Sequence, residues 1–400
     1  MPLDTGDTSF MLVATALVMI MTPGLAFFYG GLVSRKNVLA IMMQSYVSMG
    51  VSTILWVAVG YSLCFSGDVG GIIGNLDMAF LRGIEPTDLF GGADGTIPLL
   101  LFVAYQMMFA IITPALITGA FANRITFKAY LIFLVAWQIL VYYPFVHMIW
   151  GGGMLAEWGV LDFAGGIVVH ALAGMAALAS VIYVGKRRVE DAGAHNVPFV
   201  AIGAALLWFG WFGFNAGSEL AVDEVTAVAF INTQIAAAFA AITWLLLAWL
   251  YDGKPSFVEM LIGMIAGLAT ITPAAGFVSP QSAMLIGVAA GAVCYFAVVF
   301  RKKKGLDDAL DVWGVHGVGG ALGIIMLGVL ASESIGGQNG LYHGNQDFFL
   351  VQLAGLALAC VWAFAFTYGM LMMIDMITPV RVTDEAEAAL DVTLHGESAY

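Results

Sequence analysis

Eleven long apolar runs constrain this chain more than any other feature of its sequence. Hydrophobic residues make up 61% of the 400 residues and charged residues only 10%, whereas an average globular domain has roughly 25% charged residues. A helix needs roughly 20 mostly apolar residues to cross the hydrocarbon core of a bilayer. The runs are long and continuous, which favours helices over the alternating ten-residue strands of a β-barrel. We therefore predict an all-α polytopic membrane protein. The eleven expected transmembrane helices lie near residues 9–32, 38–65, 98–121, 126–146, 163–184, 197–215, 226–250, 257–275, 281–300, 311–331 and 347–376.

The same composition excludes several classes of protein. A water-soluble fold could not cover this much apolar surface with so few charges, and a disordered chain would be polar. With 14 Lys and Arg against 27 Asp and Glu, no basic face exists for nucleic acid. The three cysteines, Cys64, Cys294 and Cys360, lie in apolar stretches without metal-ligand or disulfide spacing. We therefore expect no bound metal and no other cofactor.

The basic residues predict the orientation of the chain. With the N-terminus outside and eleven crossings, 13 of the 14 Lys and Arg residues fall on the inner side, and only Arg82 lies outside. This agrees with the positive-inside rule and puts the C-terminus in the cytoplasm. Almost all of the net charge of −13 then faces outward. A negative outer face attracts cations, although loops that simply tolerate acidic residues explain the asymmetry more simply.

Two histidine motifs indicate internal symmetry. His170 lies in the fifth run and His316 in the tenth, and each is followed four residues later by a glycine, Gly174 or Gly320. An odd number of spans separates the two motifs, so the two helices run in opposite directions. That is the pattern of two inverted repeats, which often place a functional site at their interface.

We divide the chain into a transmembrane domain and a tail. The transmembrane domain covers 1–380, with two inverted five-helix repeats at about 9–184 and 197–331 and a final helix at 347–376. Residues 381–400 form a C-terminal tail, expected in the cytoplasm. The N-terminus has no basic segment ahead of its first apolar run, so we expect that run to remain as a membrane helix.

His170 and His316 are candidate functional residues because ionisable groups inside a bilayer are rare and expensive. From opposite repeats they can meet near the midplane. A pair of neutral imidazoles can hydrogen-bond to each other, and such a pair suits a neutral polar solute or a relayed proton. The alternative is two structural histidines bonded to backbone carbonyls. Their repeat-related positions favour function.

Aromatic residues gather near the expected outer surface. Trp150 lies in HMIWGGG, Phe109 in the third run, and Phe214 and Ser218 in GWFGFNAGS. A cation can bind over aromatic faces and to a hydroxyl oxygen, and bulky rings below it would exclude water. The residues alone leave Trp150 open between this role and an interfacial aromatic belt, and they favour the belt for the phenylalanines. Asp162 precedes the fifth run, and we expect it to cap that helix.

The chain also resembles the Amt/Mep/Rh family of ammonium transporters, on its bacterial and archaeal Amt branch. The similar stretches occur in the family order from one end of the chain to the other, and together they are highly specific. They are PGLAFFYGGLVSRKN (23–37), FAIITPALITGAFANR (109–124), HMIWGGG (147–153), LDFAGGIVVH (161–170), GWFGFNAGS (210–218), DVWGVHG (311–317) and LDVTLHGESAY (390–400).

The resemblance implies a homotrimer in the plasma membrane that takes up nitrogen, with one pore in each subunit. It implies an outer ammonium-recruitment site at Trp150, Phe109 and Ser218. Tyr105 stands where the family usually has another vestibule aromatic, often Phe. Phe109 and Phe214 would form the gate above the pore.

Further inward, the resemblance assigns His170 and His316 as the twin pore histidines and Trp211 as a pore-lining residue. Asp162 and Asp311 would support the site. The tail resembles the segment that couples subunits and meets PII-type signalling proteins at the cytoplasmic face.

These residues lead to an ammonium transporter as the predicted function. We expect ammonium to lose its proton at the gate and ammonia to cross the apolar pore, because a bare charge in a dry tube is prohibitive. The resemblance allows net proton transfer through the histidines, which would make transport electrogenic, and the sequence does not separate this from passive ammonia conduction. An ammonium sensor with little flux is the alternative, disfavoured because only about 20 residues follow the last span. An enzyme is not expected, because the spans hold no activated nucleophile, HExxH motif or paired catalytic aspartates.

Overall fold

The structure is a computed structural model that describes residues 3–189 and 193–400. In these residues ten helical stretches are long and apolar enough to cross a membrane. The shorter apolar helix α11 (Phe257–Ile271) supplies the eleventh. Every predicted span is therefore present, and the all-helical membrane fold is confirmed. The spans are α1 (Thr5–Leu32), α2 to α3 (Val38–Phe65), α4 (Leu99–Ile117), α5 to α7 (Phe127–Glu157), η5 with α8 (Gly166–Val184), α9 with η6 (Val197–Glu219), α10 (Glu224–Asp252), α11, α12 (Pro280–Lys304), η7 with α13 (Trp313–Leu330) and α15 (Gln346–Asp375).

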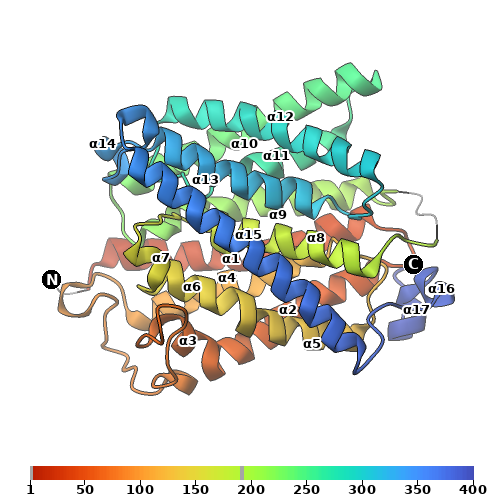
Figure 1. The fold of residues 1–400 in the computed structure, drawn as a ribbon, viewed down its shortest axis with the longest axis horizontal. Helices are drawn as coiled ribbons and strands as arrows, with labels where there is room; N and C mark the ends of the chain where they lie inside the picture. The colour runs from red at the N-terminus through yellow and green to blue at the C-terminus, as the bar shows by residue number, and fades with distance from the viewer. Residues whose placement is uncertain (1–2, 190–192) are drawn as a thin grey trace.

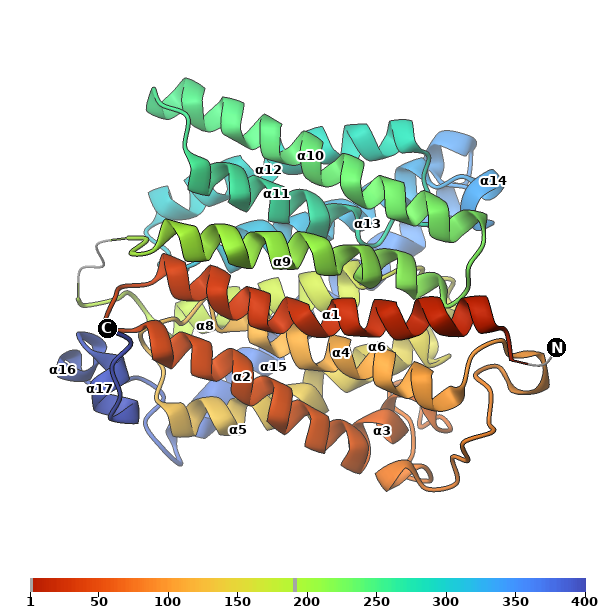
Figure 2. The same cartoon turned by 180° about the vertical axis from the view of Figure 1, so that it is seen from behind.

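The first described residues and the C-terminus lie at opposite ends of the bundle, as an odd number of crossings requires (Figure 1). We call these the vestibule end and the tail end. Figure 2 shows α1 running beside α9, and these two helices pack along their lengths. Short helices cover the two ends. At the vestibule end they are η2 (Ala79–Leu81), η3 (Gly92–Asp94), α14 (Glu333–Gly336) and η8 (Leu341–His343), and at the tail end α16 (Asp384–Glu387) and α17 (Leu390–His395).

The two histidine spans cross in a symmetric way. Each begins with a π-helical turn, η5 (Gly166–Ala171) or η7 (Trp313–Gly317), and continues as the α-helix α8 or α13. Turn η5 packs on α13 and turn η7 packs on α8. This exchange between the two halves is what two inverted repeats predict.

The glycines that follow the histidines make this close crossing possible. A Cβ atom added to Gly174 would lie 2.0 Å from the Cα of Gly317, and one added to Gly320 would lie 2.6 Å from the carbonyl oxygen of Gly166. Side chains at these two positions would therefore push the repeats apart. The glycine after each histidine serves helix packing.

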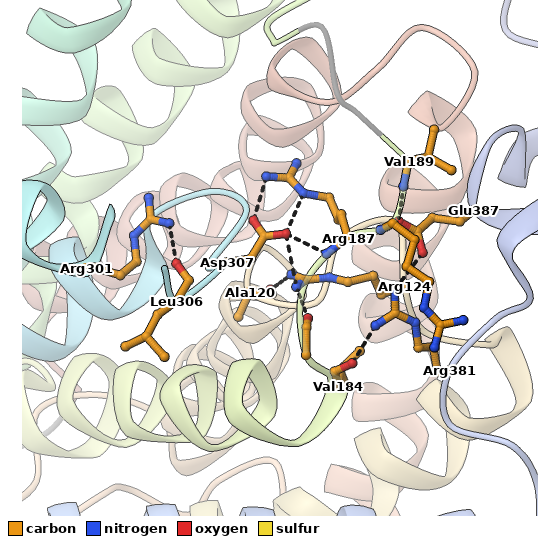
Figure 3. Close-up of polar contacts among 12 residues, drawn as sticks. Ala120, Arg124, Val184, Arg187, Val189, Arg301, Leu306, Asp307, Arg381 and Glu387 are labelled. Carbon is orange, nitrogen blue, oxygen red and sulfur yellow. Dashed lines mark hydrogen bonds and ion pairs between the residues drawn. The ribbon is translucent and has the colours of Figure 1, made fainter. Parts of the chain in front are cut away.

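A network of arginines and carboxylates ties together the tail end of the bundle (Figure 3). Asp307, between α12 and η7, accepts two side-chain bonds from Arg187, at 2.7 and 3.0 Å, and lies 3.6 Å from Arg124. Burial opposes ionisation of Asp307, but the hydrogen bonds from Arg187 outweigh it and lower the pKa of Asp307 to about 2. The loop after α8 is thus bound to the loop before η7.

The tail 381–400 packs against this end. Arg381 donates to Glu387 at 2.9 Å, and Glu387 accepts the backbone amide of Arg188 at 2.6 Å. Asp391 accepts the backbone amide of Ala40 in the first turn of α2 at 2.9 Å. The tail therefore contacts the loop after α8 and the first turn of α2 through the buried carboxylates of Glu387 and Asp391.

Candidate functional site

A hollow at the vestibule end contains Trp150, Asp162 and Ser218. Trp150 ends helix α6 (Tyr143–Trp150), and its indole Nε1 donates to the carbonyl oxygen of Asp162 at 2.8 Å. This bond fixes the orientation of the ring, and the side chain lines the hollow. A fixed indole face is the strongest cation–π partner among the protein side chains.

Ser218 offers an acceptor oxygen beside this ring. Its hydroxyl donates to the carbonyl of Phe214 at 2.9 Å, in the last turn of α9. The Tyr105 hydroxyl lies 2.9 Å from the carbonyl of Gly213 and 3.3 Å from the Ser218 oxygen. Because the Ser218 proton is already engaged, its oxygen can accept a further hydrogen bond from a ligand. Tyr105 thus contacts Ser218 and supports its position.

Two phenyl rings separate the vestibule from the interior. Phe109, from α4, lines a vestibule hollow together with Trp150 and Ser218, whereas Phe214, from α9, lines the internal cavity. Their centroids lie 4.4 Å apart, and each side chain is only 1% exposed. Phe109 also packs edge-to-face on Trp150, at 6.1 Å. The two rings form a dry partition that a solute would have to displace.

Behind the rings the two histidines meet. His170 in η5 and His316 in η7 stack with centroids 5.2 Å apart, and their Nδ1 atoms lie 3.2 Å apart. One proton fits between these nitrogens, so one ring donates while the other accepts. The donor through Nδ1 then presents a bare Nε2, and its partner carries the Nε2 proton. Two imidazolium ions would place two protons in this contact, so the geometry disfavours a doubly charged pair.

The surroundings of the histidines are almost entirely apolar. His170 also stacks on Trp211 at 5.4 Å and on Phe214 at 5.9 Å, and its Nε2 atom is buried without a partner. Trp211 is held by a bond from its Nε1 to the hydroxyl of Thr272, at 2.9 Å. The cavity wall is completed by aliphatic and aromatic side chains, among them Leu25, Ile112, Leu207, Ile265 and Val315.

Asp162 anchors the histidine turn of the first repeat. Its Oδ1 accepts the amides of Gly165 and Gly166, at 3.0 and 2.6 Å, and its Oδ2 accepts those of Ile167 and Val168, at 2.8 and 3.1 Å. One buried carboxylate therefore satisfies four free amides at the start of η5. Because its own carbonyl also holds Trp150, Asp162 links the vestibule ring to the turn that carries His170.

In the second repeat the comparable bond comes from Asp308, which the sequence analysis did not single out. Asp308 accepts the amide of Trp313 at 2.7 Å, at the start of η7. Asp308 lies eight residues before His316, just as Asp162 lies eight residues before His170, so the spacing contained the signal. Asp311 instead forms a buried ion pair with Arg301. It supports the approach to η7 from the side of α12.

The contacts of His147 at the vestibule end were also not predicted from the sequence. The ring of His147, in α6, lies 2.9 Å from the carbonyl of Cys64 through Nδ1 and 2.9 Å from Asp68 through Nε2. These contacts attach the loop after α3 to the helix that ends in Trp150. Only the fold, which brings α6 next to α3 and the loop that follows it, reveals them.

Comparison with known proteins gives a consistent result. The sequence model described as the Ammonium Transporter Family matches residues 9–400. The chain is 45% identical to the ammonium transporter of Bacillus subtilis, over 100% of this chain and 99% of that protein. The crystal structure of Candida albicans Mep2 superposes with a TM-score of 0.89 at 34% identity, over 96% of this chain and 87% of that one. A structure described as a sensor Amt protein also superposes with a TM-score of 0.89, at 28% identity over 98% of both chains.

Proposed function

Because the chain belongs to the Ammonium Transporter Family, we propose that it carries ammonium across a membrane by separating the ion into ammonia and a proton. The observation that carries the proposal is the order in which the groups follow one another from the vestibule hollow to the internal cavity. A cation-binding surface lies above two closed phenyl rings, and a histidine pair lies below them in an apolar cavity.

Recruitment takes place at Trp150, Phe109 and Ser218. The indole and phenyl faces attract the positive charge, and the Ser218 oxygen accepts one N–H bond from the ion. Tyr105 holds Ser218 in place through the contact at 3.3 Å. These contacts replace part of the hydration shell that the ion loses on entry.

Deprotonation occurs at the gate formed by Phe109 and Phe214. An ion that passed the rings intact would lie in a cavity lined mostly by carbon, where an isolated charge is very costly. Ammonia pays a far smaller desolvation penalty and can bond to the histidine nitrogens as it passes. Trp211 and the stacked Phe214 keep the His170 ring in position for this contact.

The histidine pair gives the proton a separate route. When His170 receives a proton at Nε2, passes its Nδ1 proton to His316, and His316 releases its own Nε2 proton toward the tail end, the two rings have exchanged tautomers and neither holds a lasting charge. One ammonia molecule and one proton cross in each cycle, so one positive charge moves and transport is electrogenic. Asp162 and Asp311 support this arrangement by fixing the approaches to the two histidine turns.

The assembly and placement follow the family. We propose a homotrimer in the plasma membrane, with the vestibule end and N-terminus outside and the tail end in the cytoplasm. The tail 381–400, packed on the ends of the spans, is the surface for a PII-type signalling protein. Transport is favoured over the ammonium sensor, because the chain is 45% identical to the B. subtilis transporter and only 28% identical to the sensor Amt protein.

One experiment tests the proposal directly. Purified protein reconstituted into liposomes is adsorbed on a supported membrane, and the current evoked by an ammonium pulse is recorded. We expect a current that saturates with ammonium and is absent from protein-free liposomes. Ammonium uptake without current would indicate neutral ammonia conduction, and binding without either would indicate a sensor.

A further inference from the structure

Glu219 lies in the vestibule hollow, and no role has yet been assigned to it. It ends the short helix η6 (Gly217–Glu219) and directly follows Ser218. Its half-buried side chain lines the same hollow as Trp150, Asp162 and Ser218. A carboxylate therefore stands at the wall where the cation is recruited.

The carboxylate of Glu219 differs from its acidic neighbours because it has no structural partner. Asp7 accepts the amide of Val222 at 2.8 Å, and Asp223 accepts that of Thr226 at 3.0 Å at the start of α10. Within residues 3–189 and 193–400, no hydrogen bond or ion pair engages the Glu219 side chain. A half-buried carboxylate without a partner is unfavourable by itself and becomes favourable when a cation binds beside it.

Without Glu219 the side chains of the recruitment site offer few acceptors, namely the Ser218 hydroxyl and the amide of Gln106, which lines the same hollow as Phe109. Ammonium has four N–H donors, and Ser218 supplies one oxygen while the rings supply only their faces. A carboxylate accepts several hydrogen bonds and adds an opposite charge, which makes each of them stronger. Asp223 is close enough for its negative charge to repel a second charge on Glu219, and a cation bound at Glu219 relieves this repulsion.

We propose that the Glu219 carboxylate is a further ammonium-binding group of the outer site, acting beside Trp150 and Ser218. The inference rests on the proposed function, since it assigns a third kind of contact to the same recruitment site. Glu219 raises the occupancy of the site at low ammonium and takes no part below the rings, because it does not line the internal cavity.

The test is Glu219→Gln, which keeps the shape of the side chain and removes its charge. The full chain in liposomes of neutral lipid is assayed with ammonium chloride at low and high ionic strength. The ammonium concentration that gives half-maximal current should rise about three- to ten-fold. That is the factor expected for the loss of a unit charge roughly 6 Å from the ion in partly aqueous surroundings. Maximal current should stay within about two-fold, and the salt dependence of half-saturation should shrink.

Two further variants serve as controls. Glu224→Gln removes one charge from the exposed start of α10, outside the hollow, and should leave half-saturation unchanged. Glu219→Asp keeps the charge and should lie closer to the wild type than Glu219→Gln. If Glu219→Gln fails to fold, a wild-type half-saturation that is independent of salt overturns the inference.

The outcomes separate this inference from the proposed function. If Trp150→Leu raises the half-saturating ammonium concentration while Glu219→Gln does not, the recruitment site is supported and Glu219 is not part of it. If the wild type shows neither current nor uptake, transport itself is refuted. An equal effect of Glu219→Gln and Glu224→Gln would reduce the role to general surface charge and would also overturn the inference.

Discussion

The carboxylate of Asp162 offers the sharpest test of how the vestibule and the pore are joined. In Asp162→Asn the remaining carbonyl oxygen can still accept the amides of Gly165 and Gly166. The new NH₂ group, however, faces the amides of Ile167 and Val168. Because both sides are donors, these two hydrogen bonds are lost. Each lost bond to a charged acceptor is worth about 1.5–3 kcal/mol, so the start of η5 should lose about 3–6 kcal/mol.

The assay is hydrogen exchange of the backbone amides 165–168, together with thermal unfolding in detergent. A loss of that size corresponds to exchange faster by about 10²- to 10⁴-fold and to a clearly lower unfolding temperature. Asp223→Asn is the matched control, because Asp223 accepts its helix amide with one oxygen and asparagine caps about as well as aspartate. Native exchange and stability in Asp162→Asn, combined with lost transport, would refute the capping role. Asp162 would then act on the cation itself.

Three further predictions concern the pore, the tail and the polar network behind them. His316→Leu removes both nitrogens of one ring, so ammonium current should vanish in a folded protein, and wild-type-like current would contradict the relay. His170→Glu should let potassium compete or pass because a fixed negative charge stabilises a whole cation; unchanged exclusion of potassium would place the selective step above the histidines, at Trp150 and Phe109. Deletion of 381–400 should reduce transport and abolish binding of a PII-type protein, whereas protease clipping of the native tail at the rate of an unfolded peptide would argue against docking. Asp307→Asn should lower stability by about 1 kcal/mol, after allowance for solvent screening. The hydrogen bonds from Arg187 depress the folded pKa of Asp307 to about 2. The difference in unfolding temperature between Asp307→Asn and the wild type should therefore be complete above about pH 4 and should disappear as the pH falls toward 2. A difference that persisted at pH 2 would exclude this ion pair as its source.

Hydropathy predicted the spans well because the bilayer imposes a length that composition reports directly. Its errors are at the ends. The fourth run was expected to end near residue 146, but α6 continues to Trp150, and the helical stretch resumes as α7 (Met154–Glu157) beyond the glycines. The third was expected to reach residue 121, but α4 ends at Ile117 and apolar turns follow. An apolar turn and an apolar helix have the same composition, so the sequence cannot distinguish them.

The candidate site was predictable where chemistry and position coincide in the sequence, as for the two histidines in apolar runs. It was not predictable where a role depends on a long-range neighbour. Thr272 became visible only because α11 ends beside Trp211, and His147 because the loop after α3 folds back onto α6. Asp308 is a different case, since its eight-residue spacing to His316 matches that of Asp162 to His170 and is visible in the sequence.

The π-helical turns η5 and η7 set the rotation of each histidine about the axis of the helix that follows it. An α-helix advances about 100° per residue around its axis, and a π turn accommodates one more residue before the next i to i+4 bond resumes. In η5 the amide of His170 reaches back to the carbonyl of Gly165, and in η7 the amide of Val318 reaches back to that of Trp313. If either turn relaxed to α geometry by losing one residue, the segment before it would swing by about 100° relative to the helix that follows. The facing of the two imidazoles is therefore set by residue count as much as by residue identity, and a single deletion within either turn would turn them apart.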